Sequence, residues 1–313
     1  MDGVAAVASP PRLIAIAGPT ASGKSALALR LARARNGEIV SCDSLQVYRG
    51  LDIGSAKPSA GDRAAVPHHL IDVVDPDQDF SAADYGRRAR AAIADIHARG
   101  RVPLVAGGTG LYLRALLHGL FEGPGRDQRL RRRLEAIADR HGDARLHRIL
   151  ARVDPESGGR IEPGDRVRVV RALEVYRATG KAIGEHHRDG AGPRAGFEWR
   201  VLVLDPGREA LRAAVEKRTD AMLAAGLVEE TRRLLARYPG ARPLAAIGYR
   251  QAAGVVRGVR DVEQARRDIV AETMRYAKRQ RTWFRHQETA TWFADADQAE
   301  KAASRWLDLP KSL

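Results

Sequence analysis

The chain has 313 residues, 44% of them hydrophobic, and a formal net charge of +14. This length and hydrophobic content exclude a chain that is mostly disordered, and they suit one large domain with room for an insertion. The single cysteine, Cys42, excludes an intrachain disulfide and a cysteine-based zinc site. We expect a cytoplasmic protein with no secretory signal and no membrane span. The positive charge favours a polyanionic partner, although an arginine-rich composition throughout the chain would give the same total.

Four short apolar runs predict buried strands. They cover residues 12–17, 38–42, 102–106 and 199–204, and the segments at 25–35 and 84–99 have the spacing of amphipathic helices. A longer helix is predicted over residues 208–238, where apolar residues again recur at helical spacing. Strands that alternate with helices predict an α/β fold, in which helices cover both faces of a parallel sheet.

The pattern changes between residues 125 and 196. The strand pattern stops, apolar residues recur with a helical period, and arginines are dense around residues 126–133. Residues 189–196 have the composition of a linker. We therefore expect a helical insertion at residues 126–196 within a core formed by residues 1–125 and 197–313.

A glycine-rich turn follows the first predicted strand and opens the first predicted helix. It fits G-x-x-x-x-G-K-[ST], the phosphate-binding P-loop, so the sheet is expected to be P-loop NTPase-like. The loop amides and the helix amino terminus would face a diphosphate or triphosphate. Lys24 would add a positive charge there, and the Ser25 hydroxyl can be a ligand of Mg²⁺. The predicted phosphate-binding residues are Gly18, Pro19, Thr20, Ala21, Ser22, Gly23, Lys24 and Ser25.

Two further turns follow predicted strands. Asp43 comes directly after the second strand, and a Gly-Gly-Thr-Gly turn that contains Thr109 follows the third. Ligands of parallel α/β sheets bind beyond the carboxyl ends of the strands, so both turns are expected near the P-loop. Asp43 could be a general base, a metal ligand or only a helix N-cap, and the glycine-rich turn could be purely structural.

A basic segment near the end of the chain also contains aromatic residues. Residues 266–286 hold seven arginines and lysines against two acidic residues, and Tyr276, Trp283 and Phe284 lie among them. Cations can contact nucleic-acid phosphates while aromatic rings stack on bases. An ordinary solvated helix that buries its aromatic side would show the same pattern.

Ten short motifs in a fixed order resemble the tRNA dimethylallyltransferase family, also called tRNA isopentenyltransferases, of bacterial type. The resemblance runs from residue 13 to about residue 292. The motifs are GPTASGKS (18–25), DSLQVY (43–48), IGSAKP (53–58), HHLID (68–72), GGTGLY (107–112), DPES (154–157), RALEVY (171–176), GLVEE (226–230), IGYRQ (247–251) and YAKRQRTWFR (276–285). Small departures from the family pattern stand at Ser55, Met274 and Arg281.

The resemblance implies a reaction and its participants. The donor would be dimethylallyl diphosphate, and the acceptor would be the exocyclic N6 amine of the adenosine 3′-adjacent to the anticodon in tRNA. Lys24, Ser25 and the loop amides would bind the donor diphosphate with Mg²⁺, and Arg218 would contact it as it leaves. Asp43 would be the base at the adenine amine, and Thr109 would lie near the reaction centre. We expect a monomer that holds the tRNA anticodon arm with its helical insertion.

The resemblance also implies a set of residues that meet the tRNA. They fall in the turns after two predicted strands, in the insertion, and in two segments of the C-terminal third. The set is Asp43, Ser44, Leu45, Gln46, Thr109, Arg131, Val167, Arg168, Val169, Val170, Arg171, Ala245, Ala246, Ile247, Gly248, Tyr249, Arg250, Lys278, Arg279, Gln280, Arg281, Thr282, Trp283, Phe284 and Arg285.

Three other functions share parts of this pattern. A P-loop kinase would use the same loop, Mg²⁺ and a carboxylate, but it has no need of a basic insertion of about seventy residues, which is far longer than an ordinary loop. A prenyltransferase acting on free adenine nucleotides would share the core. An RNA-binding module with an inactive P-loop would not need Lys24, Ser25 and Asp43 to be present together.

Overall fold

A computed structural model describes residues 10–120, 123–125, 127–189 and 196–310. It divides into two compact units, each described here by itself. One combines Met1–Leu116 with Ala195–Leu313, and the other is Leu117–Arg194. The linker expected around residues 190–195 lies outside the described residues.

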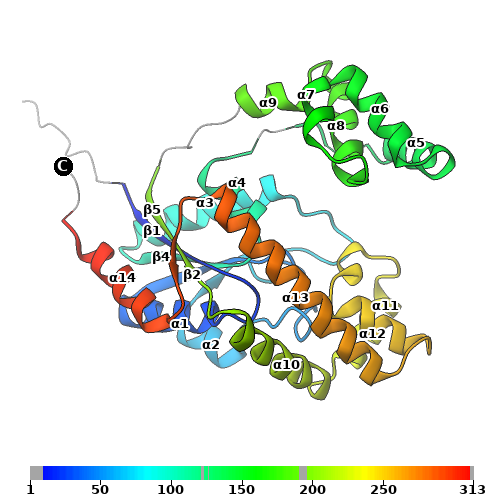
Figure 1. Cartoon of the computed structure of the whole chain (residues 1–313). Helices are drawn as coiled ribbons and strands as arrows, with labels where there is room; N and C mark the ends of the chain where they lie inside the picture. Colours follow the sequence, from blue (N-terminus) through cyan, green and yellow to red (C-terminus); the bar gives the residue numbers. More distant parts are fainter. Residues whose placement is uncertain (1–9, 121–122, 126, 190–195, 311–313) are drawn as a thin grey trace, which may run out of the picture. The chain divides into compact units, whose positions relative to one another are not determined.

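The first unit is built on a six-stranded parallel sheet (Figure 1). Its strands are β1 (Arg12–Ala17), β2 (Gly37–Cys42), β3 (His68–His69), β4 (Val102–Gly107), β5 (Glu198–Leu204) and β6 (Thr291–Phe293). They lie in the order β3-β2-β4-β1-β5-β6, and every pairing is parallel. The central strands are buried on both faces because helices cover both, which explains their unbroken apolar sequences. The predicted P-loop NTPase-like α/β sheet is confirmed.

Helices pack on both faces of this sheet. On one face, α1 (Lys24–Ala34) and α14 (Ala296–Asp308) share a core with the strands. Helix α3 (Ala82–Ala98) packs against β2 and β4 outside that core. Leu27 and Leu31 of α1 are buried against Ile14, Ile16 and Leu104 of the sheet. The remaining helices of the unit are α2 (Ala60–Ala65), α4 (Gly110–Leu117), α10 (Arg208–Ala224), α11 (Leu227–Arg237), the 3-10 helix η1 (Arg242–Ala245), α12 (Tyr249–Val256) and α13 (Val262–Gln287).

The helix predicted over residues 208–238 is wrong in one respect, because it is two helices. Helix α10 ends at Ala224, and α11 begins at Leu227. Between them Gly226 has a φ of +97°, a left-handed conformation that glycine adopts easily and that stops a right-handed helix. Apolar residues recur at helical spacing on both sides of the break, so the periodicity alone hid it.

The second unit is helical throughout its described residues. It contains α5 (Gln128–His141), α6 (Asp143–Val153), α7 (Pro155–Arg160), α8 (Arg166–Thr179) and α9 (Ile183–Asp189). Leu134, Leu146, Leu150, Val170 and Leu173 form its core with their neighbours. A separate core of this kind is what allows a segment to fold as a unit of its own.

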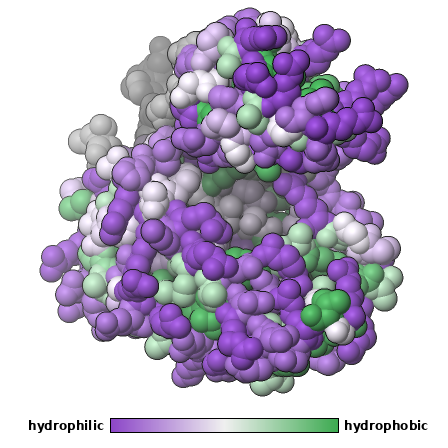
Figure 2. Space-filling view, turned by 45° about the vertical axis from the view of Figure 1, so that its right-hand side comes forward, coloured by the Kyte–Doolittle hydropathy of each residue, from purple (hydrophilic) through white to green (hydrophobic). Residues whose placement is uncertain are grey.

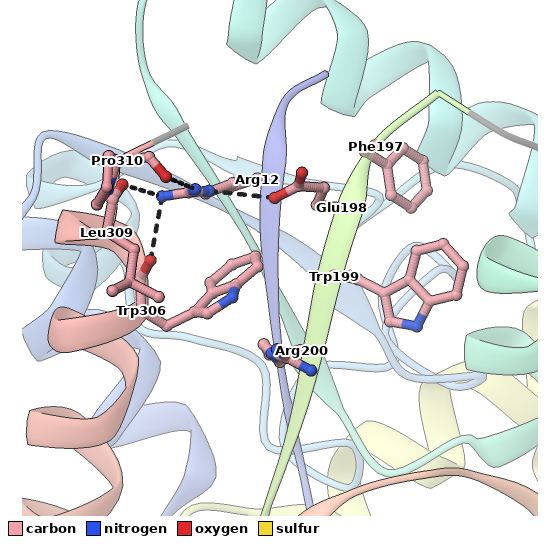
Figure 3. Close-up of a pocket in the computed structure, with 8 residues that line it drawn as sticks. All are labelled: Arg12, Phe197, Glu198, Trp199, Arg200, Trp306, Leu309 and Pro310. Atoms are coloured by element: carbon pink, nitrogen blue, oxygen red, sulfur yellow. Dashed lines mark hydrogen bonds and ion pairs between the residues drawn. The ribbon is translucent and has the colours of Figure 1, made fainter. Parts of the chain in front are cut away.

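A pocket of about 630 Å³ opens at the amino ends of β1 and β5, the edge of the sheet opposite the P-loop (Figure 3). Arg12 lines this pocket, and its guanidinium donates hydrogen bonds to Glu198 and to the carbonyl oxygens of Trp306, Leu309 and Pro310. These bonds fasten the end of α14 to the first strand. The polar atoms of Arg12 are therefore used by the protein itself.

Hydrophilic residues predominate on the face shown in Figure 2. Even the longest helix, α13, with 26 residues, is rich in charged side chains. Among the described residues, none of the helices combines the length and the apolar character needed to cross a membrane.

Candidate active site

The P-loop joins the end of β1 to the start of α1, as the sequence predicts. Lys24 is the first residue of α1, and its Nζ donates a hydrogen bond to the carbonyl oxygen of Pro19, at 3.0 Å. Ala21 has a φ of 64°, so the loop passes through a left-handed conformation at a residue other than glycine. The amino terminus of α1 carries a partial positive charge, which makes this loop suited to an anion.

Two cations meet at the loop. Arg218 of α10 reaches it, and its Nη1 donates a hydrogen bond to Thr20 Oγ1, at 3.2 Å. Burial, followed by the nearby charge of Arg218, lowers the pKa of Lys24 to about 8, against an opposing effect of Asp43. Burial also lowers the pKa of Arg218. Within the described residues, neither cation has a carboxylate oxygen within 4 Å, so their charges are not compensated by an ion pair.

Asp43 and Thr109 lie on neighbouring strand ends. Cys42 pairs with Gly107 at the carboxyl ends of β2 and β4, so the turns that follow the two strands lie side by side. Thr109 Oγ1 accepts a hydrogen bond from the backbone N–H of Ser44, at 3.1 Å. The pairing of Gly107 with both Cys42 and Ala17 places these two turns at the same edge of the sheet as the P-loop, as predicted.

The Asp43 carboxylate caps a turn through one of its oxygens. Its Oδ1 accepts hydrogen bonds from the backbone N–H groups of Leu45, at 2.8 Å, and Gln46, at 3.3 Å. Residues 44–47 form a turn rather than a helix, so the helix N-cap interpretation does not hold in that form. Oδ2 has no hydrogen-bond partner among the described residues and is available to another group.

Gln46 extends this turn to the IGSAKP loop. Its Oε1 accepts a hydrogen bond from Ser41 Oγ at 2.9 Å, and its Nε2 donates to the carbonyl oxygens of Ser55 and Ala56. Ser55 is buried, and its hydroxyl donates to the carbonyl oxygen of Leu51. The same loop is held from α11, because the buried Glu230 carboxylate accepts hydrogen bonds from the backbone of residues 52–54.

Helix α13 passes beside these turns. Burial, followed by the charge of Asp43, raises the pKa of Tyr276 to about 12. Gln280 is buried, with its amide bonded to main-chain atoms of Thr20 and Gly108. The basic residues of α13 predict only the role of its exposed side. No pattern in the sequence indicates that the buried side of α13 reaches the P-loop.

The family model described as IPP transferase matches residues 46–287. The chain belongs to the IPP transferase family. A second model, described as isopentenyl transferase, matches residues 11–74. The family resemblance predicted from the order of the motifs is therefore confirmed.

Relatives and solved structures of this family match the chain over most of its length. The tRNA dimethylallyltransferase of Anaeromyxobacter dehalogenans strain 2CP-C is 52% identical, over 94% of this chain and 98% of the relative. That of Myxococcus xanthus is 51% identical, over 91% and 92%. The tRNA isopentenylpyrophosphate transferase structure from Bacillus halodurans is 37% identical with a TM-score of 0.67, and covers 95% of each chain. A eukaryotic dimethylallyltransferase acting on tRNA is 28% identical with a TM-score of 0.75, over 95% of this chain and 77% of that one.

The residues that the family resemblance assigns to tRNA differ widely in exposure. In the first unit Ala245, Arg250, Lys278, Arg279, Thr282 and Arg285 are exposed, whereas Gly248, Tyr249, Gln280 and Phe284 are buried. Tyr249 donates a hydrogen bond to Glu230, and Arg281 pairs with Asp205 at the end of β5. Val167 and Arg168, at the start of α8, are exposed, but Val169 and Val170 belong to the core of the second unit.

Arg131 and Arg171 share one buried carboxylate. Glu174, which is 1% exposed, accepts hydrogen bonds from both guanidinium groups and from the backbone N–H of Asp127. Burial alone would raise the pKa of Glu174, but the bonds from Arg131 and Arg171 outweigh it and lower this pKa to about 2. Arg171 also donates to the carbonyl oxygen of Pro124. These contacts fasten the segment before α5 to α8.

Histidine and acidic side chains do not gather into a metal cluster within the described part of the chain. His68 and His69 are hydrogen-bonded instead, to the carbonyl oxygen of Val66 and to Glu38. Ser25 is exposed in the first turn of α1 beside Lys24, so its hydroxyl is open to a ligand.

Proposed function

We propose that the chain transfers a dimethylallyl group from dimethylallyl diphosphate to the N6 amine of the adenosine 3′-adjacent to the anticodon in tRNA. Membership of the IPP transferase family and relatives named tRNA dimethylallyltransferase support the reaction class. The observation that carries the proposal is local. Lys24 and Arg218, two cations without an ion-pair partner in the described chain, lie at the P-loop near the open oxygen of Asp43.

The loop and its cations suit a departing diphosphate. As the C–O bond to the donor breaks, negative charge grows on the diphosphate. Lys24, Arg218 and the amides at the start of α1 stabilise that charge more strongly than the charge of the bound donor. The Ser25 hydroxyl would hold Mg²⁺ there, with most of its other ligands supplied by the diphosphate and water. The metal, when bound, would neutralise part of the leaving-group charge.

Asp43 suits the acceptor side of the reaction. The adenine amine is a weak nucleophile, and it must lose a proton as the new C–N bond forms. Asp43 would accept that proton at Oδ2 while Oδ1 keeps its two bonds to the turn. A positioned base of this kind contributes roughly 10²–10⁴-fold in rate. Thr109, whose hydroxyl is bonded to the adjoining Ser44, would hold this turn in place.

The exposed basic residues suit the tRNA backbone. Lys278, Arg279 and Arg285 are exposed on α13, and Arg168 is exposed at the start of α8. The exposed arginines of α5 and α6 add to this set. Contacts from such residues to phosphates supply affinity, because each releases counterions.

One assay separates this function from its alternatives. Dimethylallyl diphosphate labelled in the allyl group is supplied with tRNA, with AMP or with no acceptor. We expect the label in tRNA, on the adenosine next to the anticodon. Label in AMP would point to a free-nucleotide prenyltransferase, and no transfer to either acceptor would overturn the proposal.

A further inference from the structure

Gln280 lies on the buried side of α13, between the P-loop and the glycine-rich turn after β4. The residue is 6% exposed. Oε1 accepts a hydrogen bond from the backbone N–H of Thr20, at 3.0 Å, and Nε2 donates one to the carbonyl oxygen of Gly108, at 2.8 Å. A single side chain therefore joins the loop that follows β1 to the turn that follows β4.

A primary amide is the group that matches these two partners. One partner is a donor and the other an acceptor, so reversing the amide would set like groups against each other. A carboxylate lacks the donor, and a thioether lacks a donor and any strong acceptor. Gly108 leaves room for the amide, because a Cβ at this position would lie 2.3 Å from Nε2 of Gln280. A side chain at position 108 would therefore collide with the amide of Gln280.

Side chains from α10 and α13 hold the P-loop at Thr20. Ala21, next to Thr20, has the left-handed φ of 64°, a conformation that persists only where the surroundings enforce it. Gln280 holds the backbone N–H of Thr20, and Arg218 holds its hydroxyl. Both hydrogen bonds are therefore made to Thr20, the residue before Ala21.

The turn on the other side of Gln280 leads to the acceptor side of the site. Thr109 follows Gly108 directly, and its hydroxyl accepts the hydrogen bond from the backbone of Ser44, the residue after Asp43. The bonds thus run from the donor loop through Gln280 to Gly108, and from Thr109 to the turn of Asp43.

We propose that Gln280 is a positioning residue that fixes the spacing between the donor diphosphate on the P-loop and the proton acceptor Asp43. This inference rests on the proposed function and names a residue that sets its geometry. Displacement of reacting groups by about 1 Å can cost roughly 10²-fold in rate. Loss of the Gln280 bonds should therefore slow the chemical step more than it weakens the binding of the donor or of tRNA.

The first test replaces Gln280 with methionine, which keeps the length of the side chain and its helix preference but loses both bonds. Gln287→Met is the matched control, because Gln287 lies on the same helix and is exposed. Single-turnover transfer at saturating donor and tRNA should fall about 10- to 100-fold for Gln280→Met and stay unchanged for Gln287→Met. The tRNA dissociation constant should stay within about threefold of wild type, since the Gln280 side chain is buried.

The second test uses pH and does not depend on how Gln280→Met folds. In Gln280→Glu, a protonated carboxyl can donate to Gly108 and accept from Thr20, whereas an ionised one can only accept. The ratio of variant to wild-type rate should therefore rise as pH falls. A purely structural role predicts a ratio that does not change with pH.

The outcomes separate the inference from the proposed function. If wild-type protein fails to transfer the label, the proposed function fails. If it transfers the label but Gln280→Met keeps the wild-type rate, or the Gln280→Glu ratio is flat, the positioning role is overturned. Loss of tRNA affinity with an unchanged single-turnover rate would overturn it as well and make Gln280 an RNA contact.

Discussion

Positively charged side chains are compensated in one region of this molecule and left uncompensated in another. In the second unit, Arg131 and Arg171 bind the buried carboxylate of Glu174. At the P-loop, Lys24 and Arg218 lie together without a carboxylate within 4 Å among the described residues, and burial lowers the pKa of each. A cation held by a buried carboxylate stabilises the fold, whereas two cations kept together without one provide a site for an anion. The net charge of the sequence counts both kinds alike.

The largest effect on the transfer rate is expected at Asp43, whose charge acts on both Lys24 and Arg218. Asp43→Asn keeps the oxygen that caps the turn but removes the basic charge. Single-turnover transfer should fall by about 10²–10⁴-fold, while donor and tRNA affinities persist. Asp261→Asn is the matched control, because Asp261 caps α13 through the same kind of bond, and its loss of charge should leave the rate unchanged. A near-normal rate for Asp43→Asn would sink the base assignment.

The next effect concerns the stability that Glu174 provides through its ion pairs with Arg131 and Arg171. Glu174→Gln leaves the half-buried guanidinium groups of Arg131 and Arg171 without their counter-charge and should lower the free energy of unfolding by about 3 kcal/mol near neutral pH. The folded-state pKa of Glu174 is lowered to about 2. The stabilisation is therefore present above the unfolded-state pKa, near 4.5, and is lost as pH falls toward 2. Denaturant unfolding at several pH values checks this, with the exposed Glu135→Gln as control. An equal effect at pH 7 and at low pH would contradict the account.

The smallest effect concerns the exposed cations of α13. The logarithm of tRNA affinity should fall linearly with the logarithm of salt concentration, and Arg279→Ala or Arg285→Ala should each reduce that slope by about 1 if it contacts one phosphate. Arg266→Ala is the control on the same helix, because Arg266 pairs with Asp220. Fluorescence titrations over a range of salt concentrations measure the slopes. Equal slopes for all three variants would move the tRNA surface away from α13.

The sequence predicts the sheet and the turns of the site because local patterns determine them. The run at residues 12–17 is apolar since β1 is buried on both faces, and the P-loop must join a strand to a helix. Asp43 and Thr109 could be placed at one edge because parallel strands end at the same edge.

Features that depend on tertiary contacts were not visible in the sequence. The short strand β6 and helix α14 pair with β5 and pack on α1, so their stability comes from partners far away in the chain. The amide of Gln280 reaches the P-loop from a segment that appears simply basic. The bond of Glu174 to Arg131 links residues 43 positions apart, and no local pattern indicates it.

The central claim is that Lys24 is an uncompensated cation at the site of the diphosphate, and proton uptake on donor binding tests it most directly. Lys24, with a pKa of about 8 in the free protein, is charged below that pH and loses its proton above it. The donor diphosphate favours the charged form, so binding should take up close to one proton near pH 9 and little near pH 7. Donor affinity should correspondingly weaken by up to about tenfold per pH unit above 8. Calorimetric titration with dimethylallyl diphosphate in buffers of different ionisation enthalpy measures this uptake. The account predicts that the uptake disappears in Lys24→Ala and persists in Arg131→Ala. Uptake that is absent from wild type, or unchanged in Lys24→Ala, would contradict it.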